Sequence, residues 1–64
     1  MTVVALVEKL KASHHRGDAI ARIIGYIVLI QRLGWENLPV NQTTKYNLKA
    51  MFRNLDIDPA AIEL

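Results

Sequence analysis

Three cationic side chains recur at helical spacing in the last third of the chain. Lys45, Lys49 and Arg53 lie four residues apart, and no Asp or Glu occurs between residues 41 and 55. On a helix this spacing places the three cations on one face, where they could contact phosphate groups and release counterions. The alternative is a helix face that is only solvated. Polar neighbours of types that hydrogen-bond base edges complete the predicted nucleic-acid-binding set, which is Gln42, Thr43, Thr44, Lys45, Asn47, Lys49 and Arg53.

The segment LPVNQTTKYNLKAMF, residues 38–52, resembles the second half of a phage-repressor-type helix-turn-helix. Val40 matches the apolar position in the turn, the letters NQTT match the polar opening of the recognition helix, and Leu48 matches an inward position. The resemblance implies that the following helix lies in the major groove of duplex DNA. The chain departs from that pattern at Pro39, where a glycine is expected, and at Lys45, where a buried aliphatic residue is expected.

Other residue types that carry chemistry are sparse. The chain has no cysteine and one serine, and its two histidines, His14 and His15, are adjacent. Adjacent residues on a helix project about 100° apart, so they rarely share a metal ion. Asp56 and Asp58 flank the start of a short helix and are interpreted as caps. We therefore expect no enzyme activity, no cofactor and no metal site.

The composition indicates one small domain, residues 1–64, with more apolar surface than it can bury alone. The chain is 52% hydrophobic with a mean hydropathy of +0.15, yet it has no disulfide to stabilise so small a core. This excess predicts a homodimer or a larger protein partner. The longest apolar run, residues 23–30, is far shorter than the roughly 20 residues that span a bilayer, and the start of the chain lacks a signal peptide pattern. We expect a cytoplasmic protein without a membrane partner.

Hydrophobic periodicity predicts an all-α fold, a compact bundle of three main helices with a short fourth helix at the C-terminus. The first helix covers residues 2–13 with Thr2 as its N-cap, and the second begins after an N-cap at Asp18 and stops near Gly34. The third covers roughly residues 43–54, and Asp58 with Pro59 begins the fourth.

The second helix is the central element of this bundle because apolar residues nearly encircle it. Its segment IIGYIVLI is rich in β-branched residues, so a buried strand is a competing interpretation, but no strong breaker interrupts residues 18–33. A helix with this much apolar surface would also hold the oligomer interface, predicted at Ile20, Ile24, Ile27 and Val28.

Two functional hypotheses follow. The first is a small DNA-associated regulatory protein that contacts duplex DNA through the basic third helix. The second is a helical protein–protein interaction module, such as an antirepressor, an inhibitor or an assembly subunit, that acts through exposed apolar surface.

Overall fold

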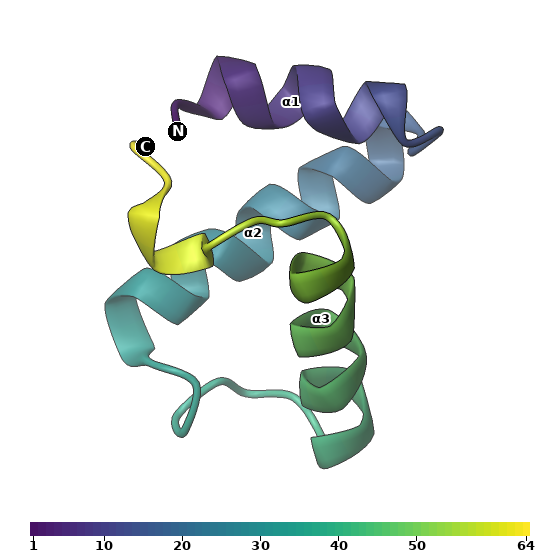
Figure 1. The fold of residues 1–64 in the computed structure, drawn as a ribbon. Helices are drawn as coiled ribbons and strands as arrows, with labels where there is room; N and C mark the ends of the chain where they lie inside the picture. The colour runs from purple at the N-terminus through teal and green to yellow at the C-terminus, as the bar shows by residue number, and fades with distance from the viewer.

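The computed structural model describes residues 1–64 and contains helices only, apart from one isolated bridge between the chain ends. Helix α1 covers Val3–Ala12, α2 covers Gly17–Leu33, α3 covers Gln42–Asn54, and the short 3-10 helix η1 covers Pro59–Ala61. In Figure 1, α1 lies across the top, α2 descends from one end of it, and α3 stands beside α2. The predicted all-α fold is confirmed, and the fourth element is a 3-10 turn. The strand interpretation of α2 is wrong.

The core forms where the apolar faces of the three helices and the C-terminal segment meet. Helix α2 supplies four of its eleven buried residues, more than any other element, so it is central as predicted. The loop before α3 and the segment after it complete a core made of Leu6, Leu10, Ile20, Ile23, Ile27, Ile30, Leu38, Leu48, Phe52, Ile57 and Ile62.

Two members of the predicted oligomer interface belong to this core. Ile27 is fully buried and Ile20 is 8% exposed within a single chain, so neither can contact a second copy without unfolding. The prediction was wrong for these two because their face of α2 packs on the rest of the same chain. Ile24 and Val28 are only half-buried and remain available to a partner.

Side-chain caps define the starts of most elements. The hydroxyl of Thr2 accepts a hydrogen bond from the Ala5 N–H (3.1 Å), and the Asn41 side chain accepts one from the Thr44 N–H (2.8 Å). The Asp58 carboxylate accepts one from the Ala60 N–H (3.0 Å). These contacts satisfy backbone donors that have no partner inside the helix. The predicted caps at Thr2 and Asp58 are confirmed.

Helix α2 begins two residues earlier than an N-cap at Asp18 would place it. Arg16 is the N-cap, with extended backbone angles and no side-chain hydrogen bond, and Gly17 is already helical. Asp18 therefore lies in the first helical turn, where its negative charge still interacts favourably with the positive end of the helix dipole. The glycine predicted to end this helix does so, since Gly34 has a φ of 79°.

The C-terminal segment returns to the beginning of the chain. The Glu63 N–H donates to the Met1 carbonyl (2.8 Å), so the two ends lie side by side (Figure 1). Nε2 of Gln31 on α2 donates to the carbonyl oxygens of Pro59 (2.9 Å) and Ile62 (2.8 Å). One side chain of α2 thus holds η1 and the residues after it against the helix.

Candidate nucleic-acid interface

Helix α3 divides into a buried side and an accessible side. Leu48 and Phe52 are 7% and 2% exposed and pack into the core. Of the predicted nucleic-acid-binding residues, Thr44 and Lys45 are half-buried, and five are exposed: Gln42, Thr43, Asn47, Lys49 and Arg53. The stripe predicted from the sequence is therefore largely accessible, with its inner edge at Lys45.

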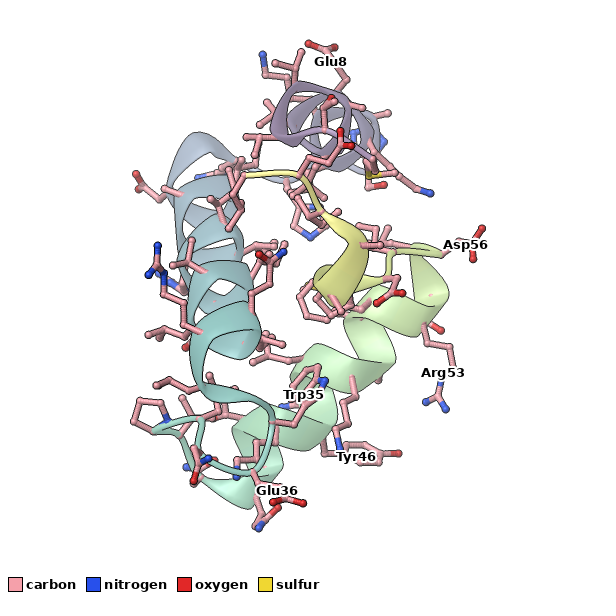
Figure 2. All side chains as sticks on the ribbon, turned by 90° about the vertical axis from the view of Figure 1, so that its left-hand side faces the viewer. Glu8, Trp35, Glu36, Tyr46, Arg53 and Asp56 are labelled. Carbon is pink, nitrogen blue, oxygen red and sulfur yellow. The ribbon has the colours of Figure 1, made fainter.

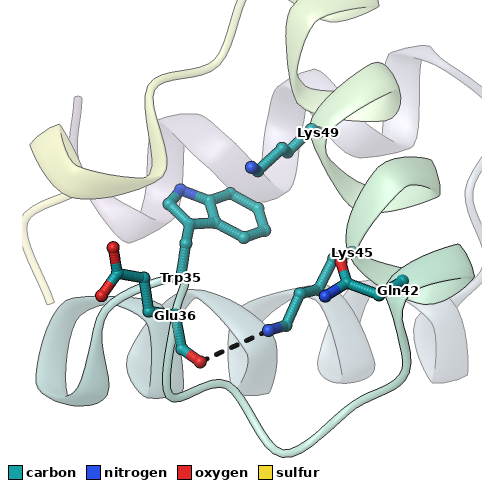
Figure 3. Close-up of a pocket in the computed structure, with 5 residues that line it drawn as sticks. All are labelled: Trp35, Glu36, Gln42, Lys45 and Lys49. Carbon is teal, nitrogen blue, oxygen red and sulfur yellow. Dashed lines mark hydrogen bonds between the residues drawn. The ribbon is translucent and has the colours of Figure 1, made fainter.

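Two of the three cations lie over the loop that leads into α3. Lys49 Nζ is 5.1 Å from the centre of the Trp35 ring, a cation–π distance. Lys45 Nζ is 3.4 Å from the carbonyl oxygen of Glu36, as the dashed line in Figure 3 marks. Trp35 is itself held by an edge-on contact with Phe52, with ring centres 6.3 Å apart. Trp35 is half-buried.

These side chains surround a shallow pocket with a volume of about 340 Å³. Its walls combine two cations with a carboxylate, an aromatic ring and an amide (Figure 3), and they are Trp35, Glu36, Gln42, Lys45 and Lys49. The N-terminus of α3 opens beside it, because Gln42 is the first residue of that helix. The Asn41 side chain caps Thr44, and the N–H groups of Gln42 and Thr43 lie too early in the helix to have an intrahelical acceptor. Cations beside a helix N-terminus favour a bound anion.

The remaining cation lies farther along α3. Arg53 and Tyr46 both extend away from the body of the protein in Figure 2. Arg53 is exposed, and Tyr46 is 69% exposed, which is unusual for a large aromatic side chain. Sequence reasoning omitted Tyr46 from the interface. Its position outside the apolar stripe of the third helix was the signal that could have placed it on the accessible side.

The connection between α2 and α3 does not match a helix-turn-helix. It occupies residues 34–41, whereas the turn of that motif has about three or four residues. Gly34 ends the second helix, and the long loop that follows places Trp35 and Leu38 against the core. The expectation drawn from the phage-repressor resemblance is therefore wrong for the turn. The surface of α3 itself is the remaining indication of what this helix contacts.

Comparison of the chain with protein-family models, curated proteins and solved structures gives no match. No group of three or more His, Asp or Glu side chains is clustered as a metal ion would require. None of the helices combines the length and the apolar character needed to cross a bilayer.

Proposed function

We propose that the protein is a DNA-associated regulator that binds nucleic acid, with duplex DNA as the leading target, through the accessible side of α3. The observation that carries this proposal is an acid-free helix that bears three cations, Lys45, Lys49 and Arg53, and that begins with two N–H groups without an intrahelical acceptor. Cations and backbone N–H groups are the donors that hold phosphates. The polar side chains of the first turns supply donors and acceptors for base edges.

The position of each side chain on α3 determines whether it is expected to contact a phosphate or a base. Lys45 and Lys49 flank the pocket at the N-terminal end of α3, so they hold a phosphate near the helix N-terminus. Arg53 lies about one turn beyond Lys49 and contacts a second phosphate. Gln42, at the pocket, and Asn47, between Lys45 and Lys49 in the sequence, are exposed and contact bases.

Salt dependence of binding tests the phosphate contacts. Three cations predict a log–log slope of affinity against salt of about −3 for one chain, or about −5 for a dimer that uses both faces. Arg53→Gln should reduce the magnitude of the slope by about one. Lys11→Gln is the matched control, since Lys11 is exposed on α1, and it should leave the slope unchanged. Equal slopes for the two variants would refute the assignment of α3 as the phosphate-binding helix.

Sequence preference tests the base contacts separately. Asn47→Ala should cost about 1–3 kcal/mol on a preferred duplex if the amide makes a bidentate base contact, with little loss on a mixed duplex. Asn54→Ala, an exposed amide at the far end of α3, is the control. If duplex DNA at low salt leaves the amide NMR signals of residues 41–53 unmoved, the proposal fails.

A second candidate function is an interaction module that self-associates through α2. One face of α2 carries Ala21, Ile24, Gly25 and Val28 in two successive turns, and none of them is buried within the chain. An apolar helix face that its own chain leaves open favours a partner helix. Sedimentation measures this directly: Val28→Glu should convert a dimer to a monomer while preserving the helical circular dichroism. A wild-type protein that stays monomeric at high concentration would exclude this candidate.

A further inference from the structure

A second pocket lies in the cleft between α2 and α3. It has a volume of about 280 Å³ and shares no lining residue with the pocket beside Trp35. One face of α2 forms one wall and one turn of α3 forms the other, with the end of the α1–α2 turn closing it. The lining residues are His15, Ala19, Arg22, Ile23, Tyr26, Leu48 and Met51.

The imidazole of His15 is the unexplained group in this pocket. Its Nδ1 atom is buried and has no hydrogen-bond partner, although enclosing a polar atom without a partner is costly. The His15 N–H donates to the Leu10 carbonyl (3.1 Å) and closes the end of α1, which fixes the backbone of this residue beside the pocket. The fold therefore keeps an unsatisfied polar group at the edge of an apolar cleft.

Arg22 is a second polar group of the lining, and it is exposed. It takes part in none of the side-chain hydrogen bonds of the protein, and no Asp or Glu lines the pocket. The N-terminus of α2, which has no side-chain cap, lies at the same end, between His15 and Ala19. Asp18, four residues before Arg22 on α2, is exposed and outside the lining.

We propose that this pocket binds a small amphipathic carboxylate of the medium-chain fatty acid class. Its hydrocarbon chain would lie on Ile23, Leu48 and Met51, and its carboxylate would face Arg22 beside the His15 ring. An apolar cleft with a few convergent polar groups is typical of small-molecule sites, and the volume is close to the lower end of their range, about 300 Å³. The charge complementarity selects an anion, and Arg is the side chain best suited to hold a carboxylate. This site is independent of nucleic-acid binding by α3.

Titration of the protein with decanoate below its micellar concentration tests the proposal. NMR signals of the Met51 methyl group, the Ile23 methyl groups and the His15 ring should move together and saturate, while those of Trp35 stay in place. Decanol should bind at least tenfold more weakly and decylamine more weakly still, because neither supplies an anion. Saturable shifts confined to the Trp35 side, or equal affinities for decanoate and decanol, would overturn the proposal.

Two variants and one control locate the ligand. Arg22→Gln should weaken decanoate binding by about tenfold to a hundredfold, the usual worth of a hydrogen bond to a charged group, without affecting decanol. Arg32→Gln, an exposed arginine at the other end of α2, should leave the affinity unchanged. Ala19→Leu should fill the cleft and abolish binding of both ligands. If Ala19→Leu fails to fold, the contrast between Arg22→Gln and Arg32→Gln decides alone, and equal affinities of those two variants would overturn the proposal.

Discussion

Two helices end on a residue that is not glycine in a backbone conformation that favours glycine. His14 follows α1 with a φ of 65°, and Asp56 follows α3 with a φ of 56°. At the end of α3 the Ile57 N–H donates to the Phe52 carbonyl (2.8 Å) and the Asp56 N–H donates to the Arg53 carbonyl (3.1 Å). This hydrogen-bond pair is the Schellman motif, and α1 ends with the same pair.

Replacing either residue by glycine should therefore stabilise the protein. A side chain in the left-handed region costs about 1–2 kcal/mol, and glycine loses about 0.5–1 kcal/mol more conformational entropy on folding. Each variant should therefore raise the free energy of unfolding by about 0.5–1 kcal/mol. Both side chains are exposed, so no buried contact is lost. Asp tolerates this conformation better than most residues, so the gain for His14→Gly should be the larger.

Urea and thermal unfolding followed by circular dichroism measure the effect. In a domain of this size, 1 kcal/mol corresponds to about 4–8 °C in Tm. The two gains should add in the double variant, because the residues end different helices. Asn54→Gly is the control, since Asn54 is exposed in the last turn of α3 and glycine there should cost up to about 1 kcal/mol. If His14→Gly and Asp56→Gly destabilise as Asn54→Gly does, the argument from backbone strain is wrong.

Three further predictions concern the core and the loop. Gln31→Glu should lower the free energy of unfolding by about 1–3 kcal/mol and loosen the C-terminal segment, because a carboxylate would replace the donor to two carbonyl oxygens. Hydrogen exchange of the C-terminal segment checks this, with Gln42→Glu as the control. Trp35 should emit at shorter wavelength than free tryptophan and resist iodide quenching in part, since its ring is half-buried; an emission spectrum like that of the free amino acid would contradict this. Ile27→Ala should cost about 2–5 kcal/mol and Ile27→Glu should unfold the chain, both followed by circular dichroism, because this side chain is fully buried.

The sequence was sufficient to predict the helices because their signals are local. Apolar residues three and four positions apart predict the buried faces of α1 and α3. Thr2 and Asp58 are capping residues that predict where α1 and η1 begin. The end of α1 was harder to define. The left-handed residue after this helix is His14, whereas glycine is the usual residue at that position.

The sequence did not predict the contacts between residues that are far apart in the chain. Nothing in the local pattern around Gln31 indicates that its side chain holds carbonyl groups about thirty residues away. The same holds for Lys49, whose spacing predicts a cation on an open helix face but not its place over Trp35. Such contacts depend on where a loop returns, which periodicity does not encode.

The contacts that Lys45 and Lys49 make within the chain bear on whether α3 can bind phosphate. A cation–π contact at an accessible site is worth about 0.5–1 kcal/mol, and Lys45 Nζ lies at the long limit for a hydrogen bond, 3.4 Å from the Glu36 carbonyl oxygen. Hydrogen bonds to charged partners are stronger, about 1.5–3 kcal/mol, so a phosphate can displace both contacts. Until then the contacts hold the two cations on one side of α3. Because both contacts are lost when a phosphate binds, they lower its affinity, but by less than the new charged hydrogen bonds raise it.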